Sequence, residues 1–207
     1  MLKKEIIFVV DPMCSWCWGF APVIEQVYAT GSDNYDFSLV VGGLRTKGDM
    51  SWDASSKGYL KGHWEEVEKR TGQPFANALF EKEDFEYDTY PACKAVVTVR
   101  ELWGNAKSFD YLHHIQKAFY VEGRDITKLD VLSELMEEAD TNVKDFQDFY
   151  QRPRAEILMQ HDFAKARSMG ANAFPSVVII DEEGHMVCQQ GYRTFLEMKK
   201  LLKEEYA

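Results

Sequence analysis

Two cysteines separated by two residues, Cys14 and Cys17, constrain this chain more than any other feature. A nearly continuous apolar run at residues 5–10 precedes the pair, and an amphipathic segment at residues 16–28 starts within it. This order predicts a buried strand and then a helix that begins at the cysteines. Unpaired N–H groups and the positive end of the helix dipole stabilise a thiolate there, and the thiolate is the nucleophile of disulfide exchange. The spacing in this setting predicts a redox-active dithiol.

Composition argues against several classes of function. The 207-residue chain has a net charge of −10, whereas a nucleic-acid partner calls for a basic surface. No stretch approaches the ~20 apolar residues of a membrane span. The first apolar run ends at Asp11 and Pro12, too early for the roughly 7–15 apolar residues of a secretory signal. We therefore expect a cytoplasmic protein with no nucleic-acid or membrane partner.

The remaining cysteines, Cys93 and Cys188, lie far from the close pair and from each other. In a reducing cytosol both are expected to be buried thiols without a disulfide. Cys188 lies on a predicted strand, which places it in the core. A role for Cys93 as a third redox thiol stays open, because it lies in the first turn of a helix behind Pro91.

The strands lie at the two ends of the chain. Four segments have strand character: residues 5–10, 36–41, 176–180 and 186–190. The first two and the helix between them predict a right-handed βαβ unit, in which Pro22 should kink the helix. The last two predict a hairpin, followed by a helix with a capping box of Thr194 and Glu197.

The middle of the chain has helical patterns and no convincing strand. Apolar stripes of period 3.6 predict helices at residues 92–103, 108–121, 127–139 and 152–169. Because both ends must share one sheet, we expect a single α/β unit, formed by residues 1–50 and 170–207. Residues 51–169 form an all-helical insertion between the second strand and the C-terminal hairpin.

A second candidate site feature, Phe174-Pro175, immediately precedes the third strand. Proline can start a strand because it has no ladder N–H to lose. Together with a dithiol at a helix start, it suggests a cis proline that brings the chain close to Cys14. A cis bond is found at only about 5–6% of X–Pro bonds in general.

Three separated motifs resemble one family. Residues 11–19 (DPMCSWCWG) are similar to the active-site segment of cytosolic FrnE-type proteins. Residues 118–126 (AFYVEGRDI), followed by Asp130-Val131-Leu132, resemble their helical insertion, and residues 173–176 (AFPS) resemble their cis-proline loop. By this resemblance the whole chain is identified as a member of the DsbA-like branch of the thioredoxin fold.

The resemblance implies a role for each site residue. Cys14 corresponds to the exposed attacking cysteine, Cys17 to the buried resolving cysteine and Pro175 to the cis proline facing them. The backbone of Phe174 would pair with an extended substrate. Trp16, between the cysteines, is the candidate for an apolar platform beside the disulfide. No cofactor is implied.

The chain departs from the strongest oxidants of the family at the residues between the cysteines. Ser15 and Trp16 stand where the periplasmic oxidants have Pro-His, so no histidine adjoins Cys14. We therefore expect a less extreme thiolate and a potential below the ≈ −120 mV of those oxidants. Asp11 would oppose thiolate formation if it lies close, and the sequence leaves its distance open.

Thiol–disulfide exchange with protein or peptide disulfides, or with glutathione, is the predicted function. A zinc half-site is disfavoured because no second cysteine pair exists and the five histidines show no ligand spacing. One alternative is a glutathione-dependent transferase or isomerase of the kappa-class or hydroxychromene-carboxylate isomerase type, whose members lack the complete dithiol. Another is a redox-silent binding module that uses Trp16 and Phe174. The helical insertion offers surface for a homodimer.

Overall fold

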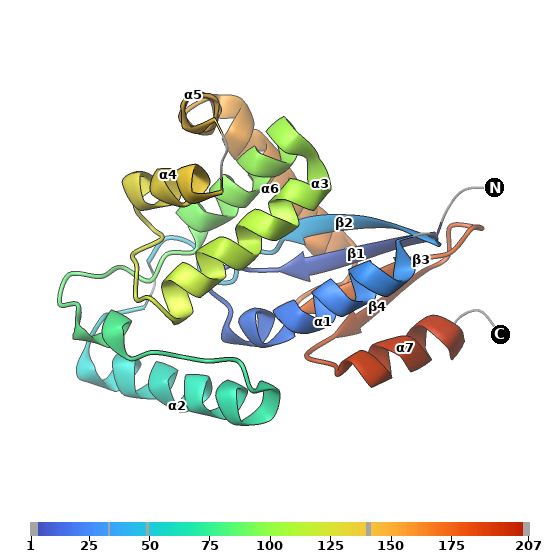
Figure 1. Cartoon of the computed structure of the whole chain (residues 1–207), viewed down its shortest axis with the longest axis horizontal. Coiled ribbons are helices and arrows are strands. Elements are labelled where there is room, and N and C mark those ends of the chain that lie inside the picture. The colour runs from blue at the N-terminus through green and yellow to red at the C-terminus, as the bar shows by residue number, and fades with distance from the viewer. Residues whose placement is uncertain (1–3, 33, 49, 140–141, 205–207) are drawn as a thin grey trace.

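The strand β1 (Lys4–Val10) lies inside a four-stranded sheet of order β2-β1-β3-β4. A computed structural model describes residues 4–32, 34–48, 50–139 and 142–204 of the chain (Figure 1). The other strands are β2 (Tyr35–Val41), β3 (Ser176–Ile180) and β4 (Met186–Gln190). β1 pairs with β2 in parallel and with β3 antiparallel, and β3 and β4 form the predicted hairpin. The predicted α/β fold is thereby confirmed.

Helices cover both faces of the sheet, and the side chains of β1 alternate between the two cores formed in this way. Ile6, Phe8 and Val10 face the larger core, which includes residues of α1 (Ser15–Gly31). Ile7 and Val9 face a smaller core that includes Ala166 of α6 (Pro153–Ser168). Figure 1 shows α1 and the last helix, α7 (Phe195–Glu204), in front of the sheet and α6 behind it.

The stretch between β2 and β3 is helical, as predicted. It contains α2 (Ala54–Thr71), a short 3₁₀ helix at Ala78–Glu81, α3 (Tyr90–Tyr120), α4 (Leu129–Glu138), α5 (Val143–Tyr150) and α6. The helices predicted at 92–103 and 108–121 are one kinked element, α3. Gly104 interrupts it with φ 87° and ψ 176°, a backbone conformation that glycine adopts without steric cost.

α1 continues through Pro22 to Gly31. Proline lacks the N–H that would bond the carbonyl of Trp18, four residues earlier. The side-chain amide of Gln73, just beyond α2, donates to that carbonyl at 3.0 Å instead. A residue of the insertion therefore completes the backbone hydrogen bonding of the helix that carries the cysteines.

An ion pair with a buried carboxylate joins the insertion to β2. Arg100 of α3 donates from Nη1 and Nη2 to the two carboxylate oxygens of Asp162 in α6, at 2.6 and 2.8 Å. The same carboxylate accepts the N–H of Val41 at 3.0 Å, and Arg100 also donates to the carbonyl of Leu39. This network fixes two helices of the insertion against the end of β2.

The division into residues 1–50 with 170–207 and an inserted unit at 51–169 stays a prediction. α3 and α6 both pack against β2, so the two parts share buried surface. Residues 1–3 and 205–207 lie outside the described part. Within the described ranges, no helix has the length and apolarity needed to cross a membrane.

Candidate active site

Cys14 is the N-cap residue of α1, and its backbone is extended at φ −88° and ψ 114°. Its carbonyl accepts the N–H groups of Cys17 and Trp18 at 2.9 and 3.1 Å, which starts the helix. The thiol therefore lies at the positive end of the helix dipole, as the sequence predicted. Its exposed fraction is 6%, so the expectation of an exposed attacking cysteine is wrong: the thiol is nearly covered.

The loop before β3 lies against that thiol. The Phe174–Pro175 peptide bond is cis, which confirms the prediction. Sγ of Cys14 lies 3.5 Å from the carbonyl oxygen of Phe174 and donates a hydrogen bond to it, across 160 positions of the chain. The carbonyl of Pro175 accepts the N–H of Gly191 at 2.8 Å, and this contact holds the loop to the end of β4.

Cys17 lies one turn into α1 and is 1% exposed. Burial raises the pKa of its thiol well above the usual range, and the hydrogen bond and charge of Cys14 act in the same direction. The backbone N–H of Asp11 donates to Sγ of Cys17 at 3.4 Å, and this contact favours the thiolate. In the reduced protein, Cys17 is therefore hard to ionise.

Asp11 lies fully buried beside the dithiol, at the end of β1. Its Oδ1 accepts the N–H of Met13 at 2.9 Å, and its Oδ2 accepts the N–H of Leu44 at 2.7 Å. Sγ of Cys93 donates to Oδ2 at 3.4 Å. Burial raises the pKa of the Asp11 carboxyl, and these hydrogen bonds oppose the shift. Asp11 therefore lies in direct contact with Cys17 and Cys93.

Cys93 and Cys188 differ from each other in burial. Cys93 is buried as expected, and burial together with the charge of Asp11 raises the pKa of its thiol well above the usual range. Cys188 on β4 is only partly buried and packs against the smaller core, so its expected place in the core is confirmed only in part. β4 is an edge strand of the sheet, which leaves one of its sides uncovered. Neither residue forms a disulfide in the structure.

Aromatic side chains surround the dithiol. Trp16 is partly exposed, and its ring centroid lies 5.8 Å from that of Tyr192. The ring of Phe174 lies over Gly42 so closely that a Cβ there would come within 2.1 Å of ring atoms. Trp18 is buried, and its Nε1 donates to the carbonyl of Pro74 at 3.0 Å. Of the two tryptophans, Trp16 is therefore the one that presents apolar surface beside the cysteines.

Sequence reasoning did not assign Gly42, Tyr87 or Thr89 to the site. The Tyr87 hydroxyl donates to the carbonyl of Met13 at 2.5 Å, and Thr89 accepts the N–H of Arg45 at 3.3 Å. Gly42 belongs to a Gly-Gly pair that ends the second strand, and that pair was the only available signal. Across the described residues, no three His, Cys, Asp or Glu side chains gather as a metal site.

Comparison with known proteins gives the family. The family model described as thioredoxin matches residues 7–199. A structure from Nitrosomonas europaea, described as a proposed protein disulfide isomerase, is 30% identical, covers 100% of both chains and has a TM-score of 0.88. The cytosolic disulfide reductase DsbM of Pseudomonas aeruginosa is 26% identical over 96% of this chain and 99% of its own, with a TM-score of 0.76.

A curated relative is the ClpXP adapter protein SpxH of Bacillus subtilis, 24% identical over 86% of this chain. The match covers 59% of that relative, so the chain spans about three fifths of its length. The family model covers nearly the whole chain, from β1 to α7. This chain therefore belongs to the thioredoxin family and has DsbA-like structural neighbours.

Proposed function

We propose that this protein is a thiol–disulfide oxidoreductase of the FrnE type, acting through Cys14 and Cys17. The observation that carries the proposal is the 3.5 Å contact between Sγ of Cys14 and the carbonyl of Phe174, next to a cis Pro175. A helix N-terminus stabilises the thiolate of a nucleophilic cysteine, and the backbone of Phe174 can pair with an extended substrate. A purely structural cysteine would gain nothing from either feature.

The first step is attack on a substrate disulfide. The Cys14 thiolate forms a bond to one substrate sulfur, and the other substrate sulfur leaves as a thiolate that takes up a proton. The product is a mixed disulfide between Cys14 and the substrate. An extended substrate chain would pair with the backbone of Phe174 and place its apolar side chains against Trp16.

The second step uses Cys17, whose pKa depends on the charge of Cys14. The hydrogen bond and charge of Cys14 help to raise the pKa of Cys17 in the reduced protein. Once Cys14 is in a mixed disulfide, that charge is gone, so the pKa of Cys17 falls. The N–H of Asp11 still supports the Cys17 thiolate. Cys17 then bonds to Sγ of Cys14 and releases the substrate as a thiolate, and the protein is left oxidised.

Substrates are proposed to be protein or peptide disulfides, with glutathione as a small-thiol partner. The neighbouring rings of Trp16 and Tyr192 suit an unfolded segment with apolar side chains. We further propose a cytoplasmic location, which the cytosolic relative supports. The same steps run backwards, so the protein can oxidise, reduce or isomerise according to the potential of its surroundings.

A redox titration against glutathione, read by thiol trapping, tests the proposal. We expect one two-electron transition that is lost in Cys14→Ser and in Cys17→Ser and is kept in the matched control Cys188→Ser. A midpoint near −270 mV would indicate a reductase, and one near −180 mV an isomerase or oxidase. The absence of any transition in the folded wild-type protein would reject the oxidoreductase.

The curated relatives named ClpXP adapter proteins favour a second candidate, a binding protein that does not turn over disulfides. The double variant Cys14→Ser/Cys17→Ser separates the two. An adapter would keep its protein partner with both serines in place, whereas an oxidoreductase would lose turnover.

The glutathione-dependent alternative predicts transferase or isomerase activity that survives Cys17→Ser. An oxidoreductase with the same substitution should instead accumulate mixed disulfides on Cys14, which mass spectrometry would detect. The homodimer expected from the helical insertion stays a prediction, and light scattering of the purified protein would check it.

A further inference from the structure

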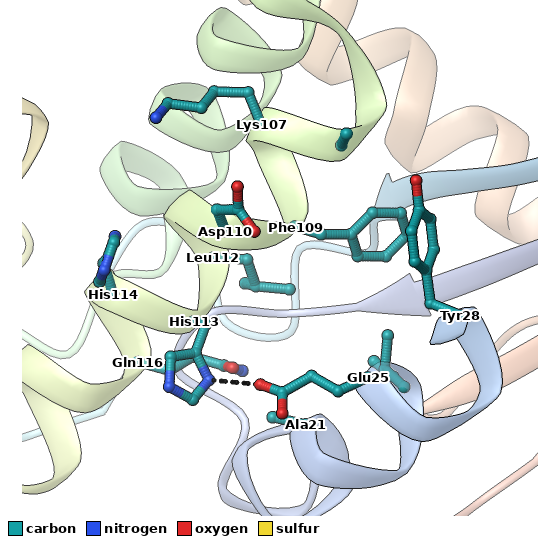
Figure 2. A pocket seen from close by; sticks show the side chains of 12 residues that line it. Ala21, Glu25, Tyr28, Lys107, Phe109, Asp110, Leu112, His113, His114 and Gln116 are labelled. Carbon is teal, nitrogen blue, oxygen red and sulfur yellow. Dashed lines mark ion pairs between the residues drawn. The ribbon is translucent and has the colours of Figure 1, made fainter. Parts of the chain in front are cut away.

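A cavity of about 370 Å³ lies between α1 and the C-terminal half of α3 (Figure 2). Its α1 wall begins at Ala21, one turn past Cys17, and extends to Tyr28. Its α3 wall extends from Ala106 to Gln116. Cys14, Cys17 and Phe174 do not line it, so it is separate from the site described above. Its volume lies in the range of small-molecule sites.

Gln116 on the α3 wall is the unusual residue of this cavity. It is 1% exposed, and neither Oε1 nor Nε2 has a hydrogen-bond partner among the described residues. A buried amide that lacks a partner costs stability, whereas an apolar side chain of similar shape does not. A glutamine at this position is explained if its amide binds something that enters the cavity.

Apolar side chains form the other walls. Ile24 and Leu112 face the cavity from the two helices. The rings of Tyr28 and Phe109 stand side by side, with centroids 5.9 Å apart (Figure 2). The buried polar atoms of the walls are those of the Gln116 amide and Nδ1 of His113, which lies 3.3 Å from Glu25. Mainly aromatic and aliphatic walls favour a flat, largely apolar ligand that is oriented by one polar edge.

The charged residues at the rim oppose an anionic ligand. Glu25 pairs with His113 at 3.3 Å, and Asp110 adds a second carboxylate (Figure 2). The ammonium of Lys107, also at the rim, donates to the carbonyl of Ala139 at 3.0 Å, so it is held away from the Gln116 amide. An anion inside would approach two carboxylates and gain little from that lysine.

We propose that this cavity binds a neutral, planar aromatic ligand whose edge carries an N–H beside a C=O, as in a lactam or a carboxamide. Such an edge donates to Oε1 of Gln116 and accepts from Nε2 at the same time. A carboxylate would satisfy Nε2 alone and would add a charge beside Glu25 and Asp110. An ammonium group would satisfy Oε1 alone. The lactam edge is the chemistry that leaves neither atom of the amide unpaired.

Quinolin-2(1H)-one is a suitable probe, because it is an aromatic lactam with adjacent N–H and C=O groups. Its N-methyl derivative lacks the donor, and quinoline-2-carboxylate replaces the lactam by an anion. We expect the lactam to bind the full-length protein in calorimetry and to shift NMR signals of α1 and α3 around the cavity. Both analogues should bind about tenfold or more weakly, because one buried amide atom stays unpaired.

Two variants and one control locate the site. Gln116→Leu should weaken lactam binding about tenfold or more and melt at or above the wild-type temperature, because the amide has no protein partner to lose. Ala106→Trp, at the exposed mouth, should block binding while Gln116 is intact. Gln26→Leu, on the exposed side of α1 outside the cavity, should bind as the wild type does.

Several results would overturn the proposal. One is equal affinity for the lactam and its N-methyl derivative, and another is unchanged binding to Gln116→Leu or Ala106→Trp. A lower melting temperature of Gln116→Leu would assign the amide a structural role, and no binding to the wild type would reject the ligand class. The redox titration of Cys14 and Cys17 in Gln116→Leu should match that of the wild type. The proposed oxidoreductase function and the proposed ligand site are therefore tested independently.

Discussion

Asp11 and Cys93, which lie 82 positions apart, meet beside the dithiol through a 3.4 Å hydrogen bond from Sγ to Oδ2. Asp11 also contacts Cys17 through its backbone N–H. One buried residue therefore joins the end of β1, the start of α3 and Cys17. Its charge raises the pKa of both thiols, so it helps to keep Cys17 and Cys93 protonated.

The ionisation of Cys17 should depend on Cys14. In the reduced wild-type protein, burial and the negative charge of Cys14 raise the pKa of Cys17 above 9.0. In Cys14→Ser the charge is absent, so we expect Cys17 to titrate at a lower pH than in the wild type. NMR of ¹³Cβ-labelled cysteine would measure both midpoints. Equal midpoints would contradict the proposal that the pKa of Cys17 falls once Cys14 is in a mixed disulfide.

The buried Asp11 should give the protein a specific dependence of stability on pH. Its folded pKa is raised above 3.8, so the folded state holds the proton more tightly than the unfolded state. The contribution of Asp11 is therefore fully present below pH 3.8 and is lost as the pH rises through the folded pKa. The difference in unfolding free energy between the wild type and Asp11→Asn should decrease over that window.

Asp11→Asn also has a cost at every pH. The amide can present its oxygen to the N–H of Met13 or of Leu44 but not to both, so one buried donor loses its acceptor. We expect a loss of about 1–3 kcal/mol from that donor alone. Urea unfolding would measure it, with Asp84→Asn as a control at an exposed position before α3. A pH-independent difference between wild type and Asp11→Asn would refute the raised pKa.

Gly42→Ala should disturb the active site from the end of β2. The added methyl carbon would lie 2.1 Å from the ring of Phe174, so the ring must move. We expect a clear drop in disulfide exchange that Gly42→Ala/Phe174→Leu restores in part, because leucine removes the ring. Gly58→Ala in α2 meets nothing within 4 Å and should be neutral or stabilising. Full exchange activity in Gly42→Ala would show that the position of this ring is unimportant.

Arg100→Met should destabilise the fold strongly. It leaves the buried Asp162 carboxylate without its cation, and we expect a loss of about 3–5 kcal/mol. The matched control is Arg154→Met, whose exposed pair with Glu101 should be worth less than about 1 kcal/mol. Urea unfolding of the two variants would measure both values. Similar losses in the two variants would argue against a special role of the Arg100–Asp162 pair.

The sequence predicted the sheet well because its two central strands, β1 and β3, are nearly continuous apolar runs. The third and fourth strands, Ser176–Ile180 and Met186–Gln190, have the predicted limits. The capping box was also correct, since Thr194 and Glu197 exchange hydrogen bonds. These features depend on neighbouring residues, which a single sequence displays directly.

Features that depend on distant contacts were harder to predict. α2 was not assigned by itself, because only Leu60, Trp64 and Val67 are buried in its 18 residues. The cis bond before Pro175 was expected from its combination with a distant dithiol at a helix start and from the family resemblance, because local sequence alone favours a trans bond. The contacts of Asp11 with Leu44 and Cys93 join distant segments, and the cavity at Gln116 lies where α1 and α3 pack. No local pattern encodes either arrangement.

The position of β3 in the chain has a consequence for biosynthesis. β1 and α1 are translated early, whereas the strand that pairs with β1 and the loop that covers Cys14 lie beyond the helical insertion. The thiol and its covering carbonyl are 160 positions apart, so this part of the fold has a high contact order and should form slowly. A nascent chain therefore carries both cysteines outside the ribosome, without their cover, while most of the protein is still being made.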